Sequence, residues 1–465
     1  MRKLFLARLP LLVILSGFCF LSLARAFSAP LQLPYTPIRT YLLGNGLEVL
    51  MVQDDEAPVV AVQVWYHVGS KDERPGMTGF AHLFEHLMFD GTRNLPSGEF
   101  SNYIVRSGGV DNAYTTEDVT VFWETIPSAD LPVALWLEAD RMRNLRITES
   151  SFNNERAVVE EELRQRFANQ PYGDVLQTLY AHAFTVSPYR HRPIGTMQDL
   201  DRARLSDVQA FYDTYYVPNN ATLVLVGDFD EKQAEGWIQS YFGPLKGTGT
   251  AISRRYTQEP AQAAERIVAL RKDVALPAFV EGYHMPADGS ADSYPMHLAA
   301  KILADGESSW IYRKLVYSKQ MAMQVDSEGD FSEEPNLFSI MAVMNQGYTP
   351  QQGEAEVASV LKRLKRGAIS STDLARARNQ MLRDLILERE GVRHRADALG
   401  YDAVVLKDPE LYNTEISRFM QVTAADVQRV AKKYFVRRNL TLVEVYPRDG
   451  GNLALQANHA SVRVR

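Results

Sequence analysis

Two histidines and a glutamate lie within five consecutive residues, His82-Leu83-Phe84-Glu85-His86. If this segment is helical, His82 and His86 stand about 40° apart around the axis, with Glu85 about 60° to the other side. Imidazoles four residues apart are a usual way for a helix to hold zinc, and a carboxylate beside them can take a proton from water. The spacing alone also fits a solvated polar helix face, but the apolar neighbours favour burial, where such groups need partners.

A third ligand is expected from the acidic segment that runs from Glu155 to Glu162. On a helix these two glutamates are seven residues apart and share one stripe to within about 20°. A catalytic zinc site takes three protein ligands and keeps one position open, and a further carboxylate can orient a ligand. The alternative for this segment is a solvated acidic helix face.

The segments around these residues alternate between strand and helix patterns. Strands are predicted over 43–52, 59–68, 118–126 and 222–226, and helices over 76–90, 132–143, 150–167 and 206–216. Strands and helices in this mixed order favour an α+β architecture in which helices pack on one face of a sheet.

A repeat at a nearly constant offset divides the chain into two. Asp207-Val208-Gln209 recurs 219 residues later as Asp426-Val427-Gln428, and Ile147-Thr148 recurs 222 residues later as Ile369-Ser370. The repeat predicts two homologous α/β-sandwich halves over 30–245 and 255–450, joined by a linker rich in Gly, Pro and Thr. Each half is expected to hold a mostly antiparallel sheet with helices packed on one face.

The first 26 residues have the features of a secretory signal peptide. They combine a basic start, an apolar run from Leu9 to Leu23 and the exit sequence Ala24-Arg25-Ala26. An uncleaved membrane anchor is the alternative, although the run is shorter than the ~20 residues of a spanning helix. We therefore predict an exported, periplasmic protein with no membrane span in its mature chain.

Composition excludes several classes of protein. The hydrophobic share of 46% and the charged share of 23% are typical of a folded globular chain. The net charge of −7 argues against a nucleic-acid binder. The one cysteine, Cys19, lies in the leader, so no disulfide framework is expected. The end of the chain, over 451–465, has no folding pattern and is predicted to be a disordered tail.

Three segments resemble the pitrilysin, insulysin and mitochondrial processing peptidase family, whose inverted zinc motif is His-x-x-Glu-His. They run from Val68 to Thr92, from Gly108 to Thr115 and from Tyr215 to Gly227, and the helix from Glu155 to Glu162 also matches. Within that family, the sequence resembles the two-subunit type found in bacteria. The resemblance covers essentially the whole chain after the leader and implies two related α+β halves.

The resemblance also implies roles for single residues. One Zn²⁺ per chain would be held by His82, His86 and Glu162, with Glu85 as the catalytic general base and Glu155 as the carboxylate that orients a ligand. Substrate would bind at Asn112 and Ala113, on an edge strand that pairs with an extended peptide.

The second half lacks a His-x-x-Glu-His sequence, and the offset of 222 places Asp384 and Ala377 where Glu162 and Glu155 stand. The family's Arg and Tyr, which help to bind substrate, correspond to Val316 and Met323. We therefore expect a homologous second subunit to supply that Arg/Tyr pair.

The function that these observations favour is a zinc-dependent endopeptidase that hydrolyses extended peptides or unfolded segments. A non-catalytic assembly or peptide-binding subunit of the same fold is the main alternative, and an exported zinc-binding chaperone is a third. Cleavage of peptides that is sensitive to chelators would separate the enzyme from the other two.

Overall fold

The computed structural model describes residues 34–254, 256–448 and 461–464. Residues 37–465 form one compact unit, apart from the residues that precede them. The predicted leader over 1–26 lies outside the described residues. Within the described part of the chain, no helix combines the length and the apolar character that crossing a membrane requires.

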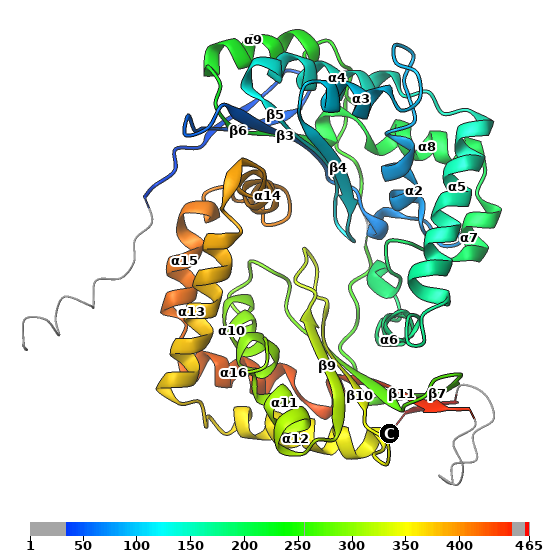
Figure 1. Ribbon diagram of the computed structural model, residues 1–465, viewed down its shortest axis with the longest axis vertical. Coiled ribbons are helices and arrows are strands. Elements are labelled where there is room, and N and C mark those ends of the chain that lie inside the picture. Colours follow the sequence, from blue (N-terminus) through cyan, green and yellow to red (C-terminus); the bar gives the residue numbers. More distant parts are fainter. Residues whose placement is uncertain (1–33, 255, 449–460, 465) are drawn as a thin grey trace, which may run out of the picture. The chain divides into compact units, whose positions relative to one another are not determined.

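The first half of the described chain contributes a six-stranded sheet (Figure 1). Its strands are β1 (Arg39–Leu42), β2 (Glu48–Gln53), β3 (Val59–Tyr66), β4 (Val110–Thr115), β5 (Thr120–Pro127) and β6 (Ala221–Gly227). Their order across the sheet is β1-β2-β6-β3-β5-β4. β2 and β6 run parallel and the other neighbours antiparallel, which leaves β4 at one edge.

The second half repeats this arrangement, again with six described strands. They are β7 (Arg266–Lys272), β8 (Ala278–His284), β9 (Ala322–Gly329), β10 (Leu337–Met344), β11 (Leu440–Pro447) and β12 (Ser461–Val464). The order is β12-β7-β11-β8-β10-β9, with β7 and β11 parallel and β9 at the edge. The prediction of an α+β fold with two related sheets is confirmed. Of the predicted tail, 461–464 pair with β7, and 451–460 and 465 lie outside the described residues.

Helices surround both sheets. In the first half these are α2 (Phe80–Leu87), α3 (Glu99–Arg106), α4 (Leu131–Asn144), α5 (Glu149–Leu163), α6 (Val175–Ala183), α7 (Met197–Arg202), α8 (Leu205–Tyr215) and α9 (Glu231–Tyr241). In the second half they are α10 (Ser293–Ala304), α11 (Trp310–Tyr312), α12 (Pro350–Lys365), α13 (Ser371–Leu387), α14 (Gly391–Val404), α15 (Leu411–Gln421) and α16 (Ala424–Tyr434).

Successive residues of β3 belong to different cores, because side chains alternate between the two faces of a sheet. Val60, Val62 and Val64 pack with the helices of their own half. Ala61 and Trp65 pack on the opposite face, in a second core. Both faces of this sheet are therefore buried, which explains why the strand is an almost unbroken apolar run.

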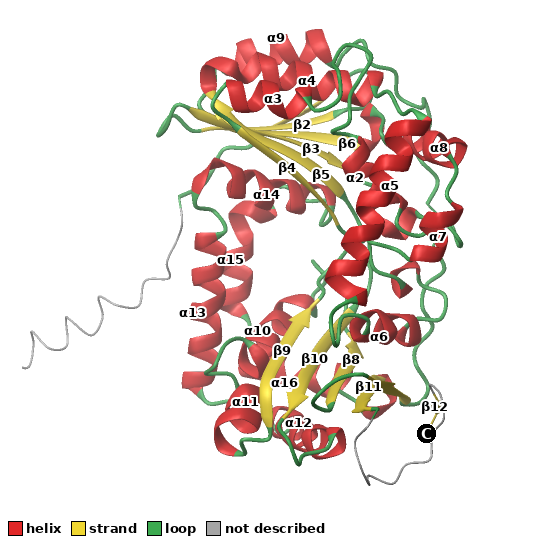
Figure 2. Cartoon of the chain, turned by 45° about the vertical axis from the view of Figure 1, so that its right-hand side comes forward, coloured by secondary structure: helices red, strands yellow, loops and turns green. Residues whose placement is uncertain are grey.

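The second face of each sheet is covered by a helix from the other half (Figure 2). Leu399 and Val404 of α14 pack on β3 and β6 of the first sheet. Val175 and Leu179 of α6 pack on β8 and β11 of the second sheet. Helices of the same half cover one face, as predicted, and this exchange of α6 and α14 covers the other.

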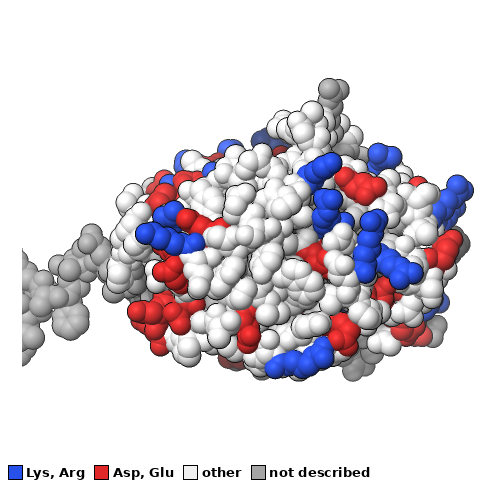
Figure 3. Space-filling view, turned by 90° about the horizontal axis from the view of Figure 1, so that it is seen from above, with Lys and Arg blue, Asp and Glu red and all other residues white. Residues whose placement is uncertain are grey.

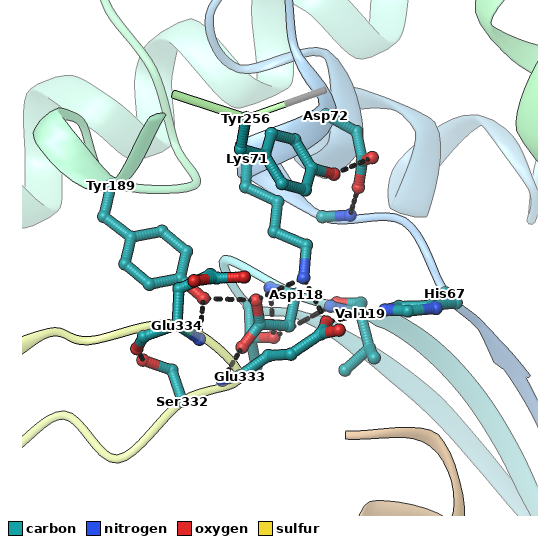
Figure 4. A network of polar contacts seen from close by, with 12 residues as sticks. His67, Lys71, Asp72, Asp118, Val119, Tyr189, Tyr256, Ser332, Glu333 and Glu334 are labelled. Carbon is teal, nitrogen blue, oxygen red and sulfur yellow. Dashed lines mark hydrogen bonds and ion pairs between the residues drawn. The ribbon is translucent and has the colours of Figure 1, made fainter. Parts of the chain in front are cut away.

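A buried network of charged groups also joins the halves (Figure 4). Lys71 and His67 of the first half contact the carboxylate of Glu333 from the second half, and the distance from His67 Nε2 to that carboxylate is 2.7 Å. Asp118 accepts hydrogen bonds from Lys71 Nζ at 2.7 Å and from the Tyr189 hydroxyl at 2.5 Å. Because an unpaired buried charge is costly, the two halves need each other at this point.

Three predicted elements differ from the structure by four residues or more at one end, and the others by one or two residues. The strand predicted from residue 43 begins at Glu48, because a turn with Gly46 at φ +92° separates it from β1. The helix predicted from residue 76 begins at Phe80, because Gly76 and Gly79 have positive φ. The helix predicted over 150–167 ends at Leu163 and continues as a π-helical turn.

The packing of α14 on the first sheet predicts that Gly400→Ala destabilises the protein. A Cβ at Gly400 would overlap the indole ring of Trp65. We expect the free energy of unfolding to fall by about 1–3 kcal/mol, the usual effect of overpacking. Urea unfolding of both proteins measures the change.

Gly236→Ala is the matched control, because Gly236 also lies within a helix and a Cβ there meets nothing within 4 Å. This change should leave stability the same or raise it by up to about 1 kcal/mol, as helix propensity predicts. Equal stability of the two variants would contradict the described packing.

Candidate metal centre

The histidines of α2 and a glutamate of α5 come together in the structure. His82 Nε2 lies 3.8 Å and His86 Nε2 3.6 Å from Glu162 Oε2, and one ligand atom from each residue lies within 4.8 Å of the others. Zinc bonds of about 2.0–2.2 Å in a tetrahedron keep ligand atoms roughly 3.3–3.6 Å apart, so these residues fit a zinc ion. They form the one such group found among the described residues.

A buried carboxylate holds the start of α2. Glu73 accepts hydrogen bonds from the backbone nitrogens of Gly79 at 3.0 Å and Ala81 at 2.8 Å, which are among the groups that a helix leaves unpaired at its N-terminus. Gly79 has φ +94°, a conformation that favours glycine. On the opposite side, the ring of Phe84 stacks on Tyr212 and Tyr216. These contacts set the direction in which both imidazoles point.

The helix α5 is fixed independently. Thr148 caps its first turn by accepting a hydrogen bond from the Ser151 nitrogen, and Phe152 and Val159 enter the first core. Glu162 lies about 60° around the helix from Val159 and faces α2, and Arg166 also contacts it at 2.7 Å.

Glu155 lies on the other side of His86, with its carboxylate 3.5 Å from Nδ1. Burial opposes a charge on His86, but the contact with Glu155 and other acids raises the pKa of that imidazole. Burial and the neighbouring His86 lower the pKa of His82 to about 4. The buried Nδ1 of His82 has no partner within the described chain. A neutral imidazole is the form that binds a metal, so His82 is prepared as a ligand.

Glu85 is held by a residue for which the sequence interpretation assigned no role. The hydroxyl of Thr115 donates a hydrogen bond of 2.6 Å to Glu85 Oε2. Burial raises the pKa of Glu85, although this hydrogen bond acts in the opposite direction. Thr115 and Glu73 both lie within the segments that carry the family resemblance, which is the signal by which they could have been found.

Asn112 and Ala113 lie on β4, as the edge-strand expectation requires. Asn112 is exposed, and its side chain accepts a hydrogen bond from the Ala113 nitrogen at 2.8 Å. Within the described chain β4 pairs only with β5, so its other edge is available to an extended peptide. Thr115 ends this strand, which connects the free edge directly with Glu85.

Comparison with known proteins identifies the family. The family model described as Insulinase (Peptidase family M16) matches residues 48–196, and the one described as Peptidase M16 inactive domain matches residues 202–381. The zinc protease PqqE of Helicobacter pylori is 33% identical over 408 residues, which cover 87% of this chain and 92% of that protein. The chain belongs to peptidase family M16.

Two other relatives of this M16 zinc protease agree with that result. The crystal structure of a protease from Helicobacter pylori superposes with a TM-score of 0.86 at 32% identity, covering 89% of this chain and 100% of that one. The probable mitochondrial-processing peptidase subunit beta of Arabidopsis thaliana is 25% identical over 434 residues, covering 90% of this chain and 79% of that protein. The resemblance inferred from the sequence motifs is confirmed.

In the second half of this M16 protease, an ion pair includes the residue that the sequence offset pairs with Glu162. Asp384 of α13, the residue that the 222 offset pairs with Glu162, accepts a hydrogen bond of 2.6 Å from Lys301 Nζ on α10. The same ammonium lies 3.0 Å from Asp305. α10 and α13 pack together as α2 and α5 do. The offset thus pairs the candidate ligand Glu162 with a carboxylate that is already bound to an ammonium group of the chain, and Ala377 is buried in the second core.

The positions expected to lack the family's Arg and Tyr are Val316 and Met323. Val316 packs against the second core, and Met323 is exposed on the edge strand β9. The nearby Tyr317 donates its hydroxyl to Glu307 at 2.7 Å. Neither Val316 nor Met323 carries a side-chain hydrogen-bond donor, so this chain brings no such donor at those two positions.

The geometry predicts that Glu162→Gln weakens zinc binding. Loss of a charged ligand should cost at least about a hundredfold in affinity, since even residues that only orient ligands cost 10- to 100-fold. Competition with a chromophoric chelator measures the affinity.

Glu160→Gln is the matched control, because Glu160 lies on the same helix but contacts Arg156 and Arg164 instead of the histidines. It should leave zinc affinity unchanged. Equal affinities of the two variants would remove Glu162 from the ligand set.

Proposed function

We propose that this M16 zinc protease is an endopeptidase that hydrolyses extended peptides or unfolded segments, with Glu85 as its general base. The observation that carries the proposal is the assembly of His82, His86 and Glu162 beside a partly buried carboxylate that Thr115 orients. A catalytic zinc site needs three such ligands and a base within reach.

His82, His86 and Glu162 would hold the zinc ion, which when bound supplies a Lewis acid that polarises a water molecule and the scissile carbonyl. Glu85 would take a proton from that water and pass it to the nitrogen of the leaving amine. Glu155 would keep His86 turned so that Nε2 faces the metal. The raised pKa of Glu85 favours the first of these steps, because it makes the carboxylate a stronger base towards the proton of the water.

The substrate would bind as an added strand on β4. Asn112 and Ala113 stand at the free edge, where main-chain groups can pair with an extended peptide whatever its side chains. Because β4 ends at Thr115, a peptide on this edge would lead its scissile bond towards Glu85.

The alternative is a peptide-binding or assembly subunit without catalysis. The complete set of ligands, base and orienting carboxylate supports the enzyme, since a binding subunit has no use for a partly buried Glu85 oriented by the hydroxyl of Thr115. We place the mature protein in the periplasm on the basis of its leader sequence, 1–26.

Glu85→Gln provides the decisive test. The amide cannot accept the proton, so the turnover of an unstructured peptide should fall by at least about hundredfold, as expected for loss of a general base. The zinc content, measured by atomic absorption, should stay at one ion per chain. Turnover that persists in zinc-loaded Glu85→Gln would sink the base assignment, and turnover absent from the wild type with zinc bound would favour the binding subunit.

We also propose that a homologous second subunit supplies the Arg/Tyr pair that this chain lacks at Val316 and Met323. A hydrolase stabilises the oxyanion of its transition state with donors, and losing one such donor typically costs about 10²–10³ in rate. Addition of the partner should therefore raise peptide turnover by about that factor. Full activity of the isolated chain, unchanged by the partner, would contradict this.

A further inference from the structure

Three consecutive charged residues, Lys71-Asp72-Glu73, lie shortly before the helix α2 that carries both histidines of the metal centre. Lys71 contacts the second half of the chain, Asp72 contacts the connection between the halves, and Glu73 contacts α2 itself. Each of the three side chains is at most 1% exposed. One short segment therefore joins the second half to the helix of the metal centre through buried charges.

Lys71 forms the contact with the second half (Figure 4). Its ammonium group contacts the carboxylate of Glu333, which also lies 2.7 Å from His67 and 2.6 Å from Lys407. Although burial opposes a charge on Glu333, its contacts with His67 and Lys71 lower the pKa of that carboxyl. The charged side chains seen on the face in Figure 3 are in contact with solvent, which screens them. Lys71 has no such screening, so the loss of Glu333 would leave a buried charge short of a partner.

Asp72 is held by the connection from α9 to β7, which joins the two halves. Its carboxylate accepts hydrogen bonds from Arg254 Nε at 3.2 Å and from the Tyr256 hydroxyl at 2.5 Å. It also accepts one from the Gly69 nitrogen at 3.1 Å. The middle residue of the segment is thus anchored between its two outer contacts.

Glu73 connects the segment with the metal centre. The helix α2 has only eight residues, so both histidines lie within about two turns of the N-terminus that Glu73 holds. His82 follows directly after Ala81, whose nitrogen donates to Glu73 at 2.8 Å. Residues of a metal site must be held within about 0.5 Å of their working positions. A shift of Glu73 would therefore displace His82 first.

The same residue of the second half also supports the strand that orients Glu85. The backbone nitrogen of Glu333 donates a hydrogen bond of 2.9 Å to the carboxylate of Asp118. Asp118 lies in the turn that follows Thr115 at the end of β4, and its carboxylate also accepts from Lys71 Nζ. Glu333 thus holds the segment before α2 with its side chain and the turn after Thr115 with its backbone.

We propose that Glu333 is a positioning residue of the metal centre, which acts on α2 through Lys71-Asp72-Glu73. The second half then contributes to zinc affinity although it supplies none of the candidate ligands. The inference rests on the candidate metal centre, and it gives the half without that centre a role in binding the ion.

The zinc affinity of full-length Glu333→Gln, measured by competition with a chromophoric chelator, tests the proposal. The amide keeps the shape of the side chain but removes its charge from Lys71. We expect zinc to bind at least about fivefold more weakly than to the wild type, the lower end of the coupling usual between two sites.

Asp54→Asn is the matched control. Asp54 also forms an ion pair between the halves, with Arg395 of α14, and its side chain is 12% exposed, against 13% for Glu333. This pair does not involve the segment 71–73, so its loss weakens the contact between the halves without reaching α2. Asp54→Asn should therefore leave zinc affinity unchanged.

Hydrogen exchange of the wild type gives a second measurement that needs no variant. A contact that raises zinc affinity must itself be strengthened by zinc to the same extent. The backbone nitrogens of Glu333 and Glu334 donate across the halves, to Asp118 and to the Tyr189 hydroxyl. Added zinc should slow the exchange of these two amides by about fivefold or more. The amide of Asn345, which is bonded within the second half, should keep its rate.

Equal zinc affinities of Glu333→Gln and Asp54→Asn would overturn the inference, and so would exchange of the Glu333 and Glu334 amides that zinc leaves unchanged. Neither measurement requires turnover. A wild type that shows both effects but cleaves no peptide would contradict the proposed peptidase and support this inference. An active peptidase whose zinc affinity ignores Glu333 would do the reverse.

Discussion

A sheet with two apolar faces must be covered on both sides, and neither half of this chain covers both faces of its own sheet. The second face of the first sheet is buried only because Leu399 and its neighbours on α14 reach it from the other half. The second face of the other sheet depends in the same way on Leu179 of α6. This mutual dependence makes residues 37–465 one unit, and it places the edge strands β4 and β9 around a common cavity. The buried contact of Lys71 with Glu333 also holds the two halves together.

The same framework fixes the positions of the side chains in the metal centre. Its candidate ligands stand on two helices, each fixed at its N-terminus by a different device: a buried carboxylate for α2 and a capping threonine for α5. Glu85 is connected through Thr115 to the strand that would hold the peptide. The proposed substrate edge, the proposed base and the candidate ligands are therefore parts of one connected arrangement, as precise positioning of reacting groups requires.

The sequence predicted the local chemistry better than the long-range assembly. The spacing of His82 and His86 and the stripe of Glu155 and Glu162 follow from helix geometry alone, so their grouping could be expected. The duplication predicted two sheets. The exchange of α6 and α14 between the halves could not be predicted from the sequence, because an apolar helix face does not indicate which sheet it will cover. The role of Glu73 does not follow from residue spacing either, since it acts on backbone groups that leave no pattern in the side chains; its place in a segment that carries the family resemblance is its one signal.

Lys301 has a consequence for how the two halves respond to their surroundings. A ligand that binds only the folded state stabilises it in proportion to the logarithm of its free concentration, so the α2–α5 pair would gain stability as zinc becomes more available. The ammonium between Asp384 and Asp305 is part of the chain, and its local concentration is the same in every medium. Thermodynamic linkage to metal supply thus enters at one half of the chain, and because each half covers a sheet face of the other, its effect on stability extends to the whole unit.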